Sequence, residues 1–315
     1  MPKNRDRAKS TFPGNYDPTS PARVIQITGL EFPFDEISSA LHNNLKKDNF
    51  WEGLRPILEQ CSPIVDIQSK LIKEVKSIRA TTGKRSLERF GNGLPMLDGS
   101  EILKYKEQFH DFATAILRVT HNLKSNLAFD VNLSLPGLME NPEAFITELS
   151  EKYNLNQGNI ILSINAVYQI FSVHSALQLR QLVEYRNWNS GFCPICAGNP
   201  EMGRIAPTDG HYYLVCSQCL TEWKFSRIGC PFCGNTDPDK LGHFKAEEYP
   251  SYLVNYCKKC NSYIKVSNEK ELNRRHLPIY DNLMTLELDS SAKSEGLHPG
   301  EIQWGEAIDS QGCMQ

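Results

Sequence analysis

Four pairs of closely spaced cysteines constrain this chain more than any other feature of its sequence. Eight of its ten cysteines form Cys-x-x-Cys pairs within 68 residues: Cys193/Cys196, Cys216/Cys219, Cys230/Cys233 and Cys257/Cys260. Two residues between the cysteines let the backbone curl so that both sulfurs face one point, and a second pair across a hairpin completes a tetrahedron. Nineteen residues separate the first pair from the second, and twenty-three separate the third from the fourth. Because these gaps are close to the spacing of four-thiolate sites, we predict two metal sites of four cysteines each.

The spacing also indicates how the pairs combine. Sequential pairing, first with second and third with fourth, closes one hairpin per site and is favoured over a cross-braced arrangement. Four protein ligands leave no open coordination position, so a structural role is favoured over a catalytic one. Tetrahedral sulfur coordination suits both iron and zinc, and both stay open. The residue after a pair often takes the left-handed backbone conformation, a role that suits Gly234 and Asn261.

The pattern of apolar and turn-forming residues divides the chain into a helical part and a strand-rich part. Residues 1–30 predict an extended arm and 31–190 a helical domain. From Gly191 on, short apolar runs alternate with Gly, Pro, Asn and Cys, and runs at 212–215, 222–225, 251–256 and 263–266 predict strands. In the helical part, apolar residues recur at steps of three and four, which indicates amphipathic helices: Ile64, Ile67, Leu71, Val75 and Ile78; Ile102, Tyr105, Phe109, Phe112, Ile116, Val119 and Leu123; Ala166, Ile170, Val173 and Leu177.

We therefore expect an α+β chain in which a helical N-terminal domain precedes two small metal-binding β modules of the zinc-ribbon kind, each with four cysteine ligands. The modules are expected over 191–226 and 227–288, with a flexible tail over 289–315. Such small modules lack the apolar area to fold alone, so their metal ions would hold them folded.

Charge and composition narrow the function classes. The 315 residues, at about 150 per domain, fit about two domains. Lys and Arg number 34 against 37 Asp and Glu, for a net charge of −3. Between Gly191 and Val266, eight basic and seven acidic residues leave a net charge of +1. This net charge is much lower than that of a typical nucleic-acid-binding surface, so nucleic acid is only a minor alternative partner.

The chain carries no recognisable targeting segment. Its N-terminal residues are basic and polar with no apolar core, which argues against a secretory signal. Apolar runs such as 160–164 are short and broken by Ser163, so we expect no membrane span. We expect a cytoplasmic protein whose cysteines are kept reduced and are available to bind metal.

Motifs of common enzymes are absent from the sequence. There is no P-loop, nucleophile elbow, dinucleotide-binding fingerprint or HExxH motif, and the eight histidines are scattered. We therefore predict that the chain is not an enzyme. Aromatic residues near the cysteines could anchor a partner, although packing against the β modules is the favoured interpretation: Trp223, Phe225, Phe232 and Tyr252.

The cysteine region resembles a known family. The segments CPICAGNPEMG, YYLVCSQCLTEWKFSRIGCPFCG and VNYCKKCNSYIKV are similar to the formate dehydrogenase accessory protein family, called FdhE. Its marks here are Thr221-Glu222-Trp223, Arg227, Tyr263 and Lys265, together with the later stretch DNLMTLELD. The resemblance is close over 191–288.

The resemblance implies a cytoplasmic maturation factor with two rubredoxin-like modules. Such a factor binds the catalytic subunit of a molybdenum- or tungsten-dependent formate dehydrogenase and does not turn over formate itself. Trp223, Arg227 and Tyr263 are the candidate partner-binding residues, and a homodimer stays open. The main alternative is a rubredoxin-like electron-transfer protein acting through four-cysteine iron centres.

Overall fold

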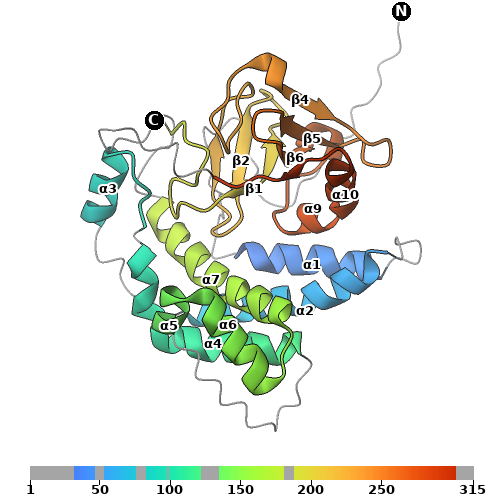
Figure 1. The fold of residues 1–315 in the computed structure, drawn as a ribbon. Coiled ribbons are helices and arrows are strands. Elements are labelled where there is room, and N and C mark those ends of the chain that lie inside the picture. Colours follow the sequence, from blue (N-terminus) through green and yellow to red (C-terminus); the bar gives the residue numbers. More distant parts are fainter. Residues whose placement is uncertain are drawn as a thin grey trace, which may run out of the picture.

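The computed structural model describes residues 32–46, 53–75, 83–97, 99–121, 135–180 and 188–302. A helical region is followed by a sheet region, as expected for the α+β class, and the two pack against each other (Figure 1). The predicted arm at 1–30 lies outside the described residues, as does the end of the chain after residue 302.

The helical region forms around one apolar core. Phe171 lies at its centre, with its ring stacked on Tyr105 and Phe112 at centroid distances of 4.7 and 5.4 Å. The described parts of the predicted periodic segments fall mainly on α2, α4 and α7, whose apolar faces supply much of this core, whereas Ile78 and Leu123 lie outside the described residues. The helices are α1 (Pro33–Leu45), α2 (Arg55–Leu71), η1 (Ile72–Glu74), α3 (Gly83–Gly91), η2 (Gly99–Tyr105), α4 (Lys106–Thr120), α5 (Leu135–Glu140), α6 (Pro142–Tyr153) and α7 (Gln157–Leu179).

Helix α7 differs from the expectation that no segment could span a membrane. In length and composition it could cross a bilayer, and it is the one such helix among the described residues. Its apolar residues are interleaved with uncharged polar ones such as Ser163 and Asn165. More than half of its most apolar stretch is buried within the protein. Burial on this scale is typical of the central helix of a helical core.

The two predicted β modules share one sheet. Its order is β3-β2-β1-β6-β5-β4, and β7 pairs with β6. Strands β1 and β6 are parallel, with Met202 opposite Lys265, and this pair joins the two halves. The structure thus differs from two separate modules, because β1 and β4, which the sequence did not predict, complete the halves. The strands are β1 (Pro200–Ile205), β2 (Tyr212–Cys216), β3 (Glu222–Lys224), β4 (Leu241–Phe244), β5 (Tyr252–Cys257), β6 (Ser262–Asn268) and β7 (His298–Pro299).

Three short helices follow the sheet: α8 (Glu269–Leu272), α9 (Tyr280–Leu283) and α10 (Leu286–Ser294). Leu288 and Ala292 of α10 pack against Met202 and Val254 on one face of the sheet. The predicted flexible tail therefore differs from the structure over 289–302, where α10 continues to Ser294 and β7 adds to the sheet.

A buried ion cluster ties the two halves of the sheet together. Arg204 on β1 donates to Glu222 on β3 at 2.7 Å and to Glu269 at the start of α8 at 3.1 Å. All three side chains are buried. Because a buried charge is costly unless it is paired, this cluster fixes the position of α8 against the sheet.

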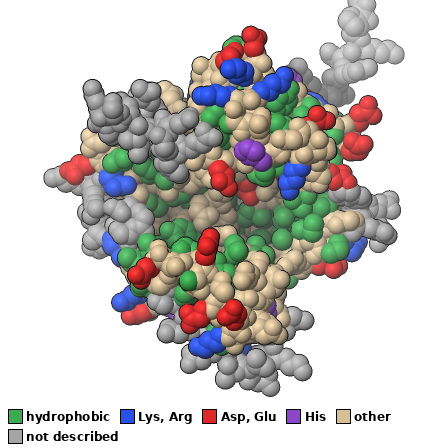
Figure 2. Space-filling model, viewed as in Figure 1, with side chains coloured by type: hydrophobic (Ala, Val, Ile, Leu, Met, Phe, Trp, Pro, Cys, Tyr) green, Lys and Arg blue, Asp and Glu red, His purple; other side chains and the backbone are tan. Residues whose placement is uncertain are grey.

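Contacts between the helical and sheet regions are polar at several points. Asn44 on α1 donates to the Tyr280 hydroxyl on α9, and Arg275 pairs with Glu36 on α1. Figure 1 shows α1 alongside α9 and α10. On the face seen in Figure 2, hydrophobic side chains gather around a hollow between the two regions.

Candidate metal centres

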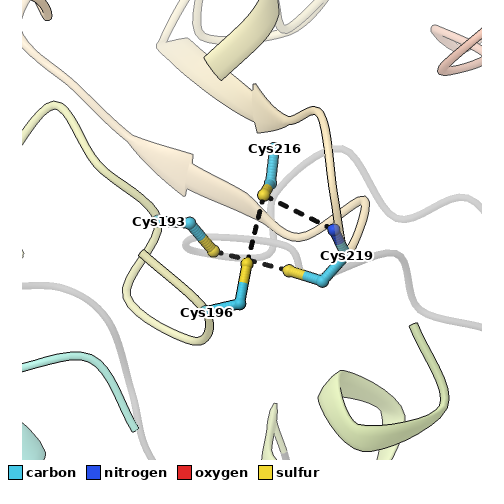
Figure 3. Close-up of side chains that lie close together, drawn as sticks. All are labelled: Cys193, Cys196, Cys216 and Cys219. Carbon is cyan, nitrogen blue, oxygen red and sulfur yellow. Dashed lines mark hydrogen bonds between the residues drawn. The ribbon is translucent and has the colours of Figure 1, made fainter. Parts of the chain in front are cut away.

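The first centre brings together four cysteines from two turns. Cys193 and Cys196 lie in the turn before β1, while Cys216 ends β2 and Cys219 follows it. Figure 3 shows their side chains converging on one point. The Sγ atoms of Cys193 and Cys219 are 3.5 Å apart, as are those of Cys196 and Cys216. A tetrahedron of thiolates about 2.3 Å from a metal has edges of about 3.8 Å, so the arrangement fits a metal ion.

The second centre repeats this arrangement. Cys230 and Cys233 lie in the loop before β4, Cys257 ends β5, and Cys260 lies in the turn before β6. The Sγ atoms of Cys230 and Cys260 are 3.6 Å apart, and those of Cys233 and Cys257 are 3.8 Å apart. The two groups that could each hold a metal ion are therefore the sequential ones, as the spacing favoured.

Local backbone geometry explains why the sulfurs converge. The amides of Ile195 and Gln218 point at Cys193 Sγ and Cys216 Sγ at 3.4 and 3.3 Å, which places two N–H donors on sulfur atoms. The residue after each pair has a positive φ: Ala197, Leu220, Gly234 and Asn261, at 54 to 66°. Gly234 and Asn261 fill the role predicted for them, whereas Ala197 and Leu220 take it despite their side chains.

Gly198 is required by close approach to a cysteine of the first centre. A Cβ at this position would lie 2.8 Å from Cys216 Sγ and 3.3 Å from Cys196 Sγ. Any larger residue would displace a sulfur or the turn that carries it.

Burial sets the charge state of these thiols. Burial raises the pKa of Cys193 and Cys230, and it raises the pKa of Cys233 to about 11. Burial would also raise the pKa of Cys219 and Cys260, but hydrogen bonds with neighbouring cysteines, and with Thr221 and Ser262 respectively, hold it below its ordinary value. One thiol in each centre therefore ionises more readily than the others, and four cannot ionise together without a compensating positive charge. A bound divalent or trivalent cation would supply that charge, so the donor set is suited to a thiolate-binding metal.

The two centres differ in their access to solvent. At the first centre only Cys196 is half-buried and the other three are buried, whereas Cys233 and Cys260 of the second are both half-buried. The second centre therefore lies closer to the protein surface.

The first centre is also attached directly to the helical region. The amides of Met96 and Leu97 donate to the carbonyls of Pro194 and Ile195, at 2.9 and 2.7 Å. Gln169 on α7 donates to the carbonyl of Ser217 at 2.9 Å. These bonds hold the first cysteine turn against the segment that follows α3 and the second turn against α7, both from distant parts of the chain. No pattern in the sequence indicated this attachment.

The candidate partner residues lie in different surroundings. Trp223 is fully buried, and its Nε1 donates to the Ser190 carbonyl at 3.0 Å. Tyr263 is buried, with its hydroxyl donating to Asp289 at 2.7 Å. In this structure neither side chain is accessible to a partner. Arg227 is exposed and donates to the Gly210 carbonyl. Phe232 and Tyr252 are also buried, and Phe225 is half-buried against the same core as Trp223, in agreement with the packing interpretation of the aromatic residues.

Comparison with known proteins shows similarity to FdhE proteins. Residues 192–227, which span the first centre and β1 to β3, match the family model "FdhE, central domain". The FdhE homologue of Aquifex aeolicus is 26% identical over 260 residues, covering 79% of this chain and 88% of that protein. The homologue of Proteus mirabilis is 27% identical over 220 residues, covering 67% of this chain and 69% of that protein. The chain is thus similar to FdhE proteins over most of its length.

A solved structure of an FdhE protein has a similar fold. The crystal structure of the FdhE protein from Pseudomonas aeruginosa superposes with a TM-score of 0.60, at 19% identity, over 84% of this chain and 92% of that one. At that identity the superposition establishes a shared fold.

Proposed function

We propose that this chain is a cytoplasmic accessory protein that binds the catalytic subunit of a respiratory formate dehydrogenase and is needed for its activity or assembly. The observation that carries the proposal is the match to the FdhE central domain at the first four-cysteine group, extended by relatives over most of the chain. In this proposal the chain does not turn over formate.

In this proposal the chain binds two metal ions, each either iron or zinc. The supporting observation is the pair of four-cysteine groups, each with sulfur separations suited to one tetrahedral ion. Cys193, Cys196, Cys216 and Cys219 would hold one ion, and Cys230, Cys233, Cys257 and Cys260 the other. Bound in this way, each ion holds its turns together, and all four of its positions are filled by protein ligands.

Affinity capture tests the accessory role. The tagged, full-length chain would be recovered from an anaerobic extract of its own organism, with Arg227→Ala as a second bait. We expect a formate dehydrogenase catalytic subunit with the first bait and less of it with the second, because Arg227 is the exposed member of the three candidate partner residues. Recovery of nucleic acid, or of no reproducible protein, would contradict the proposal.

A rubredoxin-like redox role is the second candidate, and the position of the second centre favours it. Cys233 and Cys260 are half-buried, so electrons could reach an iron ion there more readily than at the first centre. Iron at that centre would give a visible absorption band that changes reversibly by one electron. A colourless protein containing only zinc would exclude this role.

A further inference from the structure

A pocket lies beside the second centre, on the face of the sheet that carries Tyr212 and Asn255. Its volume is about 140 Å³. The sheet forms its floor through β2, β5 and β6, and the loop from Arg227 to Phe232 forms a wall. Cys230 and Cys257 of the metal centre belong to its lining. This volume suits a small molecule or a single side chain, because sites for larger ligands occupy several hundred Å³.

Hydrogen-bond donors face this pocket without a full set of acceptors. The hydroxyl of Tyr212 is buried and, among the described residues, makes no hydrogen bond of ordinary geometry, although the Asn255 side chain lies near it. Arg227 lines the pocket and donates one N–H group to the Gly210 carbonyl. A guanidinium has five N–H groups, so this bond uses only part of its donor capacity. Asn255 on β5 and His243 on β4 face each other on adjacent strands of the sheet, and both belong to the lining of the pocket. Within the described part of the chain, no Asp or Glu belongs to the lining.

A buried hydroxyl without a partner is costly, and its presence beside a guanidinium indicates an acceptor ligand. The planar fork of arginine matches a carboxylate. Arg227 is the one permanent cation that the described residues contribute to the lining, so the charge balance suits a monoanion.

We propose that this pocket binds one carboxylate group, held by Arg227, the Tyr212 hydroxyl and Asn255. Phe232, Leu241 and Ile264 provide the apolar part of the lining. The carboxylate comes either from a free small anion or from a glutamate or aspartate of another protein. This proposal does not depend on the proposed accessory role. Binding is measured on the purified chain without any formate dehydrogenase.

Calorimetric titration of the full-length, metal-loaded protein tests the site. One arm uses sodium acetate at constant ionic strength, and the other uses the capped pentapeptide Gly-Gly-Glu-Gly-Gly with its glutamine counterpart as control. We expect saturable binding of acetate or of the glutamate peptide, and none of the glutamine peptide. Binding of acetate alone would assign the pocket to a free anion. Tighter binding of the glutamate peptide than of acetate would assign it to a protein side chain.

Variants connect the binding to the named residues. Arg227→Gln should weaken binding at least tenfold, and Tyr212→Phe, which removes a single oxygen atom, should weaken it several-fold. Lys224→Gln removes an exposed charge from outside the lining and should leave binding unchanged. Metal content and thermal midpoint verify that each variant is folded, and Tyr212→Phe keeps the test valid if Arg227→Gln is not. Absence of saturable binding, or equal binding by the wild type and both pocket variants, would overturn the site.

Discussion

The ammonium group of Lys265 on β6 lies 2.6 Å from the carboxylate of Asp289 on α10, across the interface between the sheet and the last helix. Lys265 is almost fully buried, and it also donates to the carbonyls of Asn282 and Thr285. Burial lowers the pKa of Lys265, whereas Asp289 favours its charged form. The pair therefore anchors α10 to the strand that joins the two halves of the sheet.

Removal of that counter-ion should be costly. In Asp289→Asn, the Lys265 ammonium stays buried with a neutral partner, and we expect a loss of roughly 3 kcal/mol in the free energy of unfolding. Urea denaturation followed by tryptophan fluorescence measures it. Glu295→Gln, an exposed change just after the same helix, should shift the midpoint little. Equal midpoints for both variants would show that the pair contributes no stability.

Gly198→Ala should impair the first centre specifically. The added methyl group would lie 2.8 Å from Cys216 Sγ, closer than such atoms approach in proteins. We expect the purified variant to carry about one metal ion per chain, where the wild type carries two, as measured by plasma mass spectrometry. Gly91→Ala is the matched control, because nothing lies within 4 Å of its added Cβ. An unchanged metal content in Gly198→Ala would contradict this view of the turn.

Loss of a cysteine should disturb the sheet and spare the helices. Cys193→Ala and Cys257→Ala each remove one ligand, so each should lose one metal ion while the far-UV helix signal persists. Cys193→Ala should also expose the segment around Met96 to hydrogen exchange, because the turn of Cys193 accepts the amides of Met96 and Leu97. Cys257→Ala should leave that segment protected. Loss of all helicity in either variant would contradict the separate helical core.

Asp281 should make stability depend on pH in the acid range. Its carboxylate is fully buried; burial alone would raise its pKa, but hydrogen bonds and charge from His276 and Arg274 hold that pKa well below its ordinary value. Tyr252 and the Leu277 amide donate to it as well, each at 2.7 Å. A group whose pKa is lower in the folded state stabilises that state above its unfolded pKa, about 4, and loses this contribution as pH falls below it.

The corresponding variant is Asp281→Asn. At pH 7 we expect it to be less stable than the wild type by roughly 3 kcal/mol, because Arg274 loses its buried partner. The difference between the two proteins should shrink as pH is lowered from 5 to about 3, which urea midpoints across that range would reveal. A difference that stays constant with pH would mean that the ionised form of Asp281 is not what stabilises this region.

Local sequence patterns predicted the main helices and the grouping of the cysteines, because residues close together in the chain determine both. The apolar periodicity placed the main helices, and the cysteine spacing grouped the ligands as the structure does, because each turn and hairpin is built from neighbouring residues. Strands β1 and β4 were missed because each contains a glycine covered by an aromatic ring from the adjacent strand. Cβ atoms at Gly203 and Gly242 would collide with the rings of Tyr212 and Tyr256. That relationship is visible only once the strands are paired.

Burial of aromatic side chains was likewise decided by distant segments. Trp223 is an aromatic residue close to a cysteine pair, which made it a candidate partner anchor beside the favoured packing interpretation, and its ring lies in the core between the sheet and the cysteine turns. Tyr263 is covered by α10, a helix that extends into the predicted tail. Which segments cover these two rings depends on the tertiary fold, and no local pattern around either residue reveals it.

The parallel pairing of β1 with β6 also has a consequence for synthesis on the ribosome. Strand β1 emerges about sixty residues before the strand that pairs with it, so its outer edge has no hydrogen-bond partner during that interval. The four cysteines of the first centre are complete well before β6 appears, and metal capture there can fix the first hairpin while the nascent chain is still short. Because β6 covers that edge, the time for which this aggregation-prone edge stays exposed depends on how soon β6 follows the metal-bound hairpin.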